Sequence, residues 1–281
     1  MASLLRNRAA MIAAAIMSFV VLLILIAPLL SPWEIDATDW DNIATAPSWS
    51  TAHYFGTDDV GRDIFARTLY GGRISLLVGL SATLVSLLIG VMWGAVAGYA
   101  GGRTDQIMMR FVDVLYAMPF MFFVILLMVF FGRNIFLIFI AIGAVNWLDM
   151  ARIVRGQTLS LKNREFVEAA RAGGVSSFAI IRRHIVPNLL GVVIVYVTLT
   201  IPQVILVESF LSFLGLGVQE PMTSWGALVN DGSALMESAP WTLIFPATFL
   251  ALTLFCFNFV GDGLRDALDP KDRSQNGGGR S

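Results

Sequence analysis

The sequence predicts an all-α polytopic membrane protein with six transmembrane helices. Of its 281 residues, 57% are hydrophobic and only 14% are charged, whereas soluble domains have about 45–50% apolar and about 25% charged residues. Several uncharged runs approach or exceed the roughly 20 residues that a helix needs to cross a bilayer. Lysine and arginine gather in alternate connections between these runs, which is typical of proteins that cross the membrane several times.

The first predicted span covers residues 9–30, a run of 22 residues without a charge. A cleaved signal peptide is the alternative, but its apolar region is usually about 7–15 residues long and precedes a small-residue cleavage site. This run is longer, and the residues 28–32 that end it, P-L-L-S-P, are a poor cleavage site. We therefore expect an uncleaved helix after a cytoplasmic N-terminus at residues 1–8.

The second predicted span covers residues 74–99, and its 26 uncharged residues exceed what the roughly 30 Å hydrocarbon core requires. Such a helix can carry a stripe of small residues that lets a neighbouring helix approach closely. The alternative is that these residues reflect the general abundance of glycine in membrane helices. The small residues recur at every fourth position and are Ser86, Gly90, Gly94 and Gly98.

Four further apolar runs complete the six spans: residues 114–131, 135–148, 189–207 and 241–260. The three residues 132–134 predict a tight turn, so the third and fourth spans should form an antiparallel hairpin. The fourth run has only 14 residues, so Asp149 and Arg152 must lie near its end and face protein or water. At the start of the third span we expect Asp113 to form a helix-end ion pair with Arg110.

The distribution of lysine and arginine predicts that both termini are cytoplasmic. With the N-terminus inside, 15 of the 19 basic residues lie in cytoplasmic segments and four lie in extracytoplasmic ones. Connections rich in lysine and arginine stay on the cytoplasmic side of the membrane. The predicted cytoplasmic segments are residues 1–8, 100–110, 149–188 and 261–281, and the extracytoplasmic segments are 31–73, 132–134 and 208–240.

Composition and motifs argue against several function classes. The net charge of −1 lacks the basic excess of a nucleic-acid-binding protein. A single cysteine, Cys256, and two distant histidines, His53 and His184, argue against a metal site. The sequence has no Gly-Lys pair and so no standard P-loop for ATP, and it lacks the G-x-S-x-G and H-E-x-x-H motifs of hydrolases. We expect neither a catalytic site nor a cofactor in this chain.

The cytoplasmic segment 149–188 predicts two short helices joined by glycines. Helix formers run from Glu165 to Arg171, and Glu168 stands three residues before Arg171 on one face, where the two side chains can pair. The glycine pair 173–174 should end this helix, because glycine readily takes the left-handed conformation of a helix end.

The second short helix of this segment should be amphipathic. Ser176 or Ser177 can cap it, and Arg182 and Arg183 lie opposite an apolar stripe. Pro187 should mark the return of the chain to the membrane. Such a helix pair can fill a groove on a soluble partner, although a pair lying on anionic lipid is the alternative. The apolar stripe, at i, i+3 and i+7, consists of Phe178, Ile181 and Ile185.

The extracytoplasmic segment 31–73 is too long to be a simple turn. It carries seven acidic residues, together with Trp33, Trp40 and Trp49. Two interpretations remain open, a solvated loop with interfacial aromatic residues or part of a docking surface for an external partner.

The segment 149–188 also resembles a known motif. Its residues Glu168-Ala169-Ala170-x-x-x-Gly174 and Ile185-Val186-Pro187 resemble the E-A-A loop of ABC-importer permease subunits. The sparse pattern of that loop is E-A-A, three residues, G, nine residues and I-x-L-P. His184 and Val186 depart from it, but the ending R-H-I-V-P-N at residues 183–188 resembles the R-H-I-L-P-N-like ending of one subfamily.

Four further motifs resemble those of the C-type subunit of the dipeptide/oligopeptide permease group. They follow one another in order and at family-like spacing, which makes the resemblance specific for this group. The motifs are F-G-T-D-D-V-G-R-D at residues 55–63, L-S-F-L-G-L-G at 211–217, S-W-G at 224–226 and G-D-G-L-R-D-A-L-D-P at 261–270.

The resemblance implies the type I ABC-importer permease (MetI-like) fold, with residues 74–260 as the permease core and 261–281 as a cytoplasmic tail. It implies a location in a bacterial or archaeal cytoplasmic (inner) membrane. The implied partners are a homologous second permease subunit, two ABC ATPases that bind ATP and Mg, and an extracytoplasmic substrate-binding protein. The residues implied to couple transport to the ATPases are Glu168, Ala169, Ala170, Arg171, Gly174, His184 and Pro187.

The resemblance implies di- or oligopeptides as substrates, and it leaves alternatives. Importers of nickel, glutathione and antimicrobial peptides carry closely similar subunits. An ion-coupled secondary transporter would usually show an internal repeat, and none is visible in this sequence. A membrane-embedded scaffold without transport is a third class.

Two polar residues in the predicted spans are candidates for the translocation path, Glu208 and Asn258. An unpaired charge at the centre of a membrane helix costs roughly 2.5–3.5 kcal/mol on insertion scales, so Glu208 should face protein or water. It either lies near a peptide amino group or satisfies a neighbouring helix. Asn258 is either a substrate contact or a helix-packing hydrogen bonder.

Overall fold

The computed structural model describes residues 7–131 and 135–268, and helices make up its regular structure. In these residues strand pairing is limited to three isolated β-bridges, all within residues 38–63, so the predicted all-α class is confirmed for the described part. The helices are α1 (Arg8–Leu30), α2 (Ile64–Ala100), α3 (Gly102–Tyr116), α4 (Phe120–Phe131), α5 (Ile135–Leu161), α6 (Glu165–Ala172), α7 (Ser177–Ile180), a π-helical turn (Ile181–Ile185), α8 (Val186–Phe213), α9 (Trp225–Ala234) and α10 (Trp241–Leu268).

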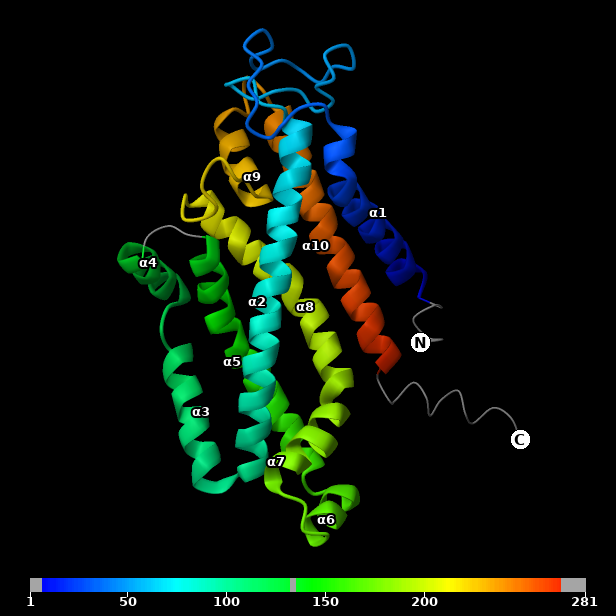
Figure 1. Ribbon diagram of the computed structural model, residues 1–281, viewed down its shortest axis with the longest axis vertical. Helices are drawn as coiled ribbons and strands as arrows, with labels where there is room; N and C mark the ends of the chain where they lie inside the picture. Colours follow the sequence, from blue (N-terminus) through cyan, green and yellow to red (C-terminus); the bar gives the residue numbers. More distant parts are fainter. Residues whose placement is uncertain (1–6, 132–134, 269–281) are drawn as a thin grey trace, which may run out of the picture.

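The long helices form an elongated bundle around α2 (Figure 1). The 37 residues of α2 span about 55 Å. α5 packs along α2, α1 packs against α10, and α8 contacts both α2 and α10. The segment 31–63 and α9 lie at one end of the bundle, and α6 and α7 lie at the other (Figure 1). The start of α1 and the end of α10 point toward the α6–α7 end.

Four helices in the described residues are long and apolar enough to cross a membrane: Arg8–Ala27, Ile64–Ala100, Ser177–Phe213 and Trp241–Ala267. Several helices extend well beyond the predicted uncharged runs, and α5 continues for thirteen residues after residue 148. α2 begins ten residues before residue 74, and α10 continues for eight residues after residue 260. Charged residues end an uncharged run without ending the helix, because long side chains can reach water or a partner while the backbone stays helical.

The third predicted span, residues 114–131, is not one helix. α3 ends at Tyr116 and α4 begins at Phe120. Pro119 lies in the gap, where it has no amide hydrogen for a helical bond and disfavours helical backbone in the residue before it. The predicted pairing of Asp113 with Arg110 is wrong, because the Asp113 carboxylate accepts a 2.9 Å hydrogen bond from Nη2 of Arg152 on α5. The turn predicted at residues 132–134 lies outside the described residues.

The small-residue stripe of α2 lies directly against α5. At Gly94, an added Cβ would overlap the backbone carbonyl oxygen of Ala151. Ser86 at the start of the stripe is fully buried. Only glycine leaves room for such a close approach of two helix backbones. The contacts of this glycine seam are Gly90 with Met150, Gly94 with Ala151 and Gly98 with Thr158.

Arg73 joins α2 to the end of α1. Its Nε donates to the Ile24 carbonyl at 2.9 Å, and its Nη2 donates to the Leu25 carbonyl at 3.0 Å. Pro28 has no amide hydrogen, so the Ile24 carbonyl four residues earlier lacks its usual helical donor. Arg73 supplies that donor, which explains a cation beside an apolar helix.

Residues 31–63 form a folded outer cap at the end of the bundle (Figure 1). His53 has no exposed surface; its Nδ1 lies 2.9 Å from Oδ2 of Asp63 and its Nε2 lies 3.3 Å from Oδ2 of Asp39. The ring of Trp33 stacks on His53, with 4.4 Å between centroids. Asp63 also caps α2, because its Oδ1 accepts an amide hydrogen bond of 2.7 Å in the first turn. The sequence alone assigns no role to His53, which proves to be the centre of the outer cap.

The F-G-T-D-D-V-G-R-D motif also holds the outer cap together. Oδ1 of Asp58 accepts the Arg62 amide hydrogen at 2.8 Å, and Oδ2 accepts from Nε of Arg62 at 2.7 Å. Arg62 also donates to the Glu220 carboxylate, which joins the outer cap to the chain after α8. That hydrogen bond lowers the pKa of Glu220. Gly61 has a φ of +80°, a backbone conformation that residues with a side chain rarely adopt. The residues of this motif therefore have a structural role, which is to stabilise the fold of the outer cap.

Gly94→Leu should destabilise the bundle, because the added side chain would enter the α5 backbone. Overpacking of this kind typically costs about 1–3 kcal/mol, so the thermal unfolding midpoint of the detergent-solubilised protein should fall. Met92→Leu is the matched control, since Met92 lies on the same helix and is 45% exposed. Equal midpoints for the two variants would contradict a tight seam.

Candidate functional site

The segment 149–188 begins inside α5 and contains both short helices. The first, α6, ends in a hydrogen-bonded glycine cap. The Val175 amide donates to the Ala170 carbonyl and the Gly174 amide donates to the Arg171 carbonyl, both at 3.1 Å. Gly174 has a φ of +76°. This pair of bonds around a left-handed glycine is the Schellman motif. Gly174 therefore reverses the chain direction after α6.

The second helix continues into the membrane bundle. Ser176 caps α7, since its Oγ accepts the Ala179 amide hydrogen at 3.4 Å. The helix then passes through the π-helical turn, in which the Val186 amide donates to the Ile181 carbonyl, and it runs unbroken from Ser177 to Phe213. Pro187 does not interrupt this continuous helix, although its missing amide hydrogen leaves one carbonyl of the preceding turn without its usual helical donor.

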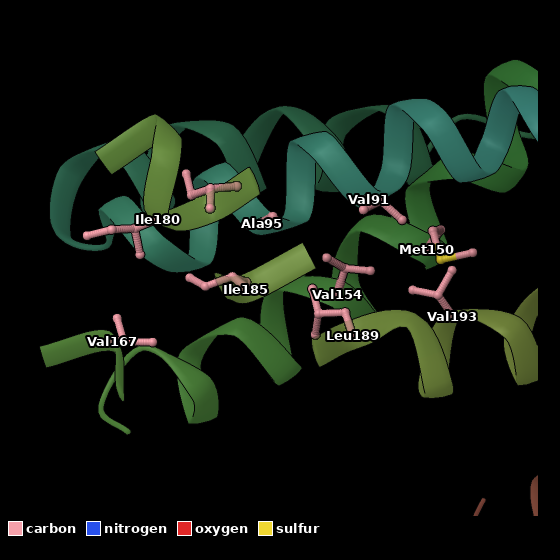
Figure 2. Close-up of a cluster of buried hydrophobic side chains, with 10 residues drawn as sticks. Val91, Ala95, Met150, Val154, Val167, Ile180, Ile185, Leu189 and Val193 are labelled. Atoms are coloured by element: carbon pink, nitrogen blue, oxygen red, sulfur yellow. The ribbon is translucent and has the colours of Figure 1, made fainter. Parts of the chain in front are cut away.

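A hydrophobic cluster fastens α6 and α7 to the long helices (Figure 2). Val167 of α6 and Ile180 of α7 have no exposed surface. Figure 2 shows their side chains beside residues of α2, α5 and α8. Full burial of one aliphatic side chain contributes about 1.5–3 kcal/mol, so the attachment is strong for so small an element. We call this group the anchor cluster; it consists of Val91, Ala95, Met150, Val154, Val167, Ile180, Ile181, Ile185, Leu189 and Val193.

The predicted apolar stripe of the second helix is only partly correct. Ile181 and Ile185 are buried as expected, but Phe178 is 61% exposed and Ile180 takes the inward position. The predicted spacing holds from Ile181 to Ile185, across the π-helical turn, and fails before it, in the single turn of α7. Phe178 is left on the outer surface of the segment.

The side of α6 and of its glycine cap that faces away from the bundle is exposed. Glu168, Ala169 and Gly174 are exposed there. The predicted pair of Glu168 with Arg171 is not among the ion pairs of the described residues; instead, the Arg171 guanidinium lies over the ring of Tyr99 at 5.5 Å. The remaining predicted residues are Ala170 and His184, which are half-buried, and Pro187, which is exposed. The segment thus has one face packed on the bundle and one face free to meet a partner.

Glu208 lies inside the bundle and has no exposed surface. Its carboxylate accepts hydrogen bonds from Ser212 Oγ at 2.7 Å and from Ser75 Oγ at 3.3 Å. Ser75 Oγ in turn accepts the amide hydrogen of Trp225 at 3.2 Å. The carboxylate therefore connects α8 to α2 and to the first residue of α9. By contrast, Asn258 is exposed on α10, and its Nδ2 donates to the Leu254 carbonyl at 2.9 Å.

Comparison with known proteins identifies the family. The profile described as "Binding-protein-dependent transport system inner membrane component" matches residues 90–274, which include the glycine seam and the anchor cluster. The chain belongs to this family. A second profile, described as "N-terminal TM domain of oligopeptide transport permease C", matches residues 1–47. The resemblance to permease subunits of the dipeptide/oligopeptide group is thereby confirmed.

Several relatives are similar over nearly the whole chain. The oligopeptide transport system permease protein OppC of Haemophilus influenzae is 61% identical over 268 residues, 95% of this chain and 86% of the relative. OppC of Escherichia coli K12 is 60% identical over 267 residues, 95% of this chain and 88% of the relative. The dipeptide transport system permease protein DppC of Bacillus subtilis is 49% identical over 269 residues, 95% of this chain and 83% of the relative.

A solved structure shows a similar fold. An inward-facing conformation of the MetNI methionine ABC transporter matches with a TM-score of 0.58 and 16% identity, covering 71% of this chain and 94% of that chain. At this identity the likeness concerns the fold alone. The predicted MetI-like helical fold therefore has a structural counterpart.

Ile185→Ala should loosen α6 and α7 without unfolding the bundle. Ile185 is fully buried in the anchor cluster, and removing such a side chain typically costs about 2–5 kcal/mol. Amide hydrogen exchange of residues 165–180 should become faster, as measured by mass spectrometry. Leu190→Ala is the control, because Leu190 is 51% exposed on the same helix. Unchanged exchange in Ile185→Ala would show that the cluster does not hold the short helices.

Proposed function

We propose that this chain is a membrane-spanning permease subunit of an ATP-driven ABC importer that translocates di- or oligopeptides. The observation that carries the proposal is 60–61% identity to oligopeptide permease subunits across 95% of the chain. Peptides are favoured over nickel or glutathione, because the relatives reported above are named as peptide permeases. Membership of a family of transport components also argues against an ion-coupled transporter or a scaffold.

We propose six membrane crossings with both termini in the cytoplasm. α1, α2, α5, α8 and α10 would each cross once, and α3 with α4 would form the third crossing. Two observations support this topology: the start of α1 and the end of α10 point toward the α6–α7 end, and 15 of the 19 basic residues lie in the sequence segments predicted to be cytoplasmic. The proposed regions are residues 1–8, 9–30, 31–73, 74–260 with the coupling loop 149–188, and 261–281.

We propose that the exposed face of α6 and α7 contacts the ATPases. ATP and Mg would be bound by these partner subunits, since this sequence has no P-loop. A homologous second permease would complete the channel, and an external binding protein would deliver the substrate to the side of the outer cap. Trp40 and Trp49 are 71% and 88% exposed there. The proposed coupling residues are Glu168, Ala169, Ala170, Arg171, Gly174, His184 and Pro187.

The mechanism that this arrangement supports is alternating access driven from outside the chain. The anchor cluster joins the short helices to α2, α5 and α8, so a displacement of α6 by a closing ATPase pair moves these helices with it. The chain then transmits force and shapes the path without making or breaking a covalent bond. For Glu208, the hydrogen bonds from Ser75 and Ser212 support the structural alternative, and Asn258 stays a candidate path residue.

Gly174→Ala should reduce substrate-stimulated ATP hydrolysis by the assembled importer. An added Cβ at Gly174 meets no atom within 4 Å, so the penalty comes from its φ of +76° alone and should be roughly 1–2 kcal/mol. Gly173→Ala is the matched control, because Gly173 has a φ of −76° and an added Cβ would lie 3.4 Å from the nearest atom. Insertion into the membrane should be normal in both variants.

The coupling proposal also predicts the effect of a charge reversal. Glu168→Lys changes an exposed side chain on the outer face of α6, so it should impair ATPase retention or stimulated hydrolysis without affecting insertion. Purified complexes of Gly174→Ala and Glu168→Lys are compared with the unmodified complex. If both retain the ATPases and full stimulated hydrolysis, the segment 149–188 is not the coupling element.

Single cysteines on opposite ends of the bundle should label from opposite sides of the membrane. Asp59 of the outer cap and Arg171 of α6 are both exposed, and Cys256→Ala removes the native thiol. An impermeant thiol reagent added to intact cells should label Asp59→Cys and leave Arg171→Cys unlabelled. Labelling of both positions from outside would overturn the proposed topology.

A further inference from the structure

Residues of α3 and α5 line a charged cleft. These two helices lie on the side of the bundle away from α1 (Figure 1). The volume of the cleft is about 850 Å³. It is separate from the outer cap and from the short helices α6 and α7. Three arginines and one aspartate face it, so its chemistry is that of a site for charged groups. The residues that line it include Gln106, Met109, Arg110, Asp113, Arg152 and Arg155.

Two ion pairs join α3 to α5 in this cleft, and they differ in kind. Arg155 donates two hydrogen bonds to Asp105, at 2.6 and 2.7 Å, and Asp105 is only 7% exposed. A bidentate pair whose carboxylate is buried is a structural clamp, even though the Arg155 side chain is 35% exposed. It holds the two helices at a fixed separation.

The second pair is open to solvent. Arg152 donates a single hydrogen bond of 2.9 Å to Asp113, and the side chains are 37% and 57% exposed. The Arg152 guanidinium also lies over the ring of Tyr116 at 4.2 Å. An exposed pair with one hydrogen bond contributes little to stability, so either member can exchange its partner for another charged group at low cost.

The apolar surroundings of this open pair favour a position facing water or protein over one facing lipid. α4 is apolar from Phe120 to Phe131, and Asp149 is the first charged residue of α5. Charged side chains beside such apolar helices face protein or a water-filled cavity. Since the clamp already ties the two helices together, the open pair is not needed for that purpose, and its exposed groups are available to a solute in the cavity.

We propose that Asp113, Tyr116 and Arg152 form a contact site for the passing peptide, at which its charged groups exchange with the Arg152–Asp113 pair. This inference rests on the proposed function as a peptide permease. The Arg152 guanidinium would receive a carboxylate, since its planar donors match carboxylate geometry. Asp113 and the face of Tyr116 would receive an ammonium group. A peptide with a glutamate side chain brings an additional carboxylate and one with a lysine side chain an additional ammonium group, so the two kinds of peptide differ in how strongly they depend on Arg152 and on Asp113.

The test compares uptake of two tripeptides with free ends, alanyl-glutamyl-alanine and alanyl-lysyl-alanine, by the full complex in proteoliposomes. For each variant, uptake is divided by that of the unmodified complex, so the preference of the binding protein cancels. Arg152→Gln should slow the acidic peptide at least about threefold more than the basic one, and Asp113→Asn should do the reverse. Arg152→Lys keeps the charge and should preserve the ratio between the two peptides.

Two controls separate this site from a structural effect and from the proposed function. The double change Asp105→Asn with Arg155→Gln breaks the clamp without changing the net charge, and it should change uptake of both peptides by the same factor. If Arg152→Gln and Asp113→Asn also change both peptides by the same factor, or change neither, the contact site is refuted. If the unmodified complex takes up neither peptide, the proposed function as a peptide permease is contradicted instead. Failure of the contact site and failure of the proposed function therefore give different results.

Discussion

The close approach of α2 and α5 is the constraint on which the rest of the structure depends. At Gly94 the α2 backbone lies where a side chain would overlap α5. This approach brings Val91 and Ala95 of α2 beside Met150 and Val154 of α5, and these four residues form the surface on which the short helices pack. A larger residue in the glycine seam would separate the two helices and open a gap under the anchor cluster. The packing of α6 and α7 therefore depends on glycines of α2, which let α2 and α5 approach closely.

Both ends of α2 are fastened to the elements that would meet partners. At one end, Asp63 caps the helix and binds His53 of the outer cap. At the other end, Nζ of Lys162 donates to the Gly98 carbonyl at 3.1 Å, just beyond α5. α2 thus runs from the outer cap to the coupling segment as a continuous helix, with hydrogen bonds to both. A subunit that relays movement across a membrane needs such a stiff connection.

The sequence predicted much of the fold because its strongest signals are local. Uncharged runs, the glycine stripe and the E-A-A motif each depend on residues that are close in sequence. Two of the errors concern pairings that depend on distant contacts. Asp113 pairs with Arg152 on another helix instead of Arg110 on its own, and Arg171 lies over Tyr99 instead of beside Glu168. The sequence did not indicate that Val167 is buried, because a single valine in a polar helix forms no apolar stripe. In the structure it is fully buried against the bundle.

The central claim is that the short helices and the long helices move as one body, and a distance measurement tests it most directly. Spin labels at Ala172→Cys and Leu190→Cys, in a Cys256→Ala background, report the separation of α6 from α8; both positions are exposed. In the assembled importer, pulsed electron resonance should give one narrow distance that is the same with and without ATP. A distance that shifts or broadens when ATP binds would show that the segment hinges on the bundle, and the account of rigid coupling would be wrong.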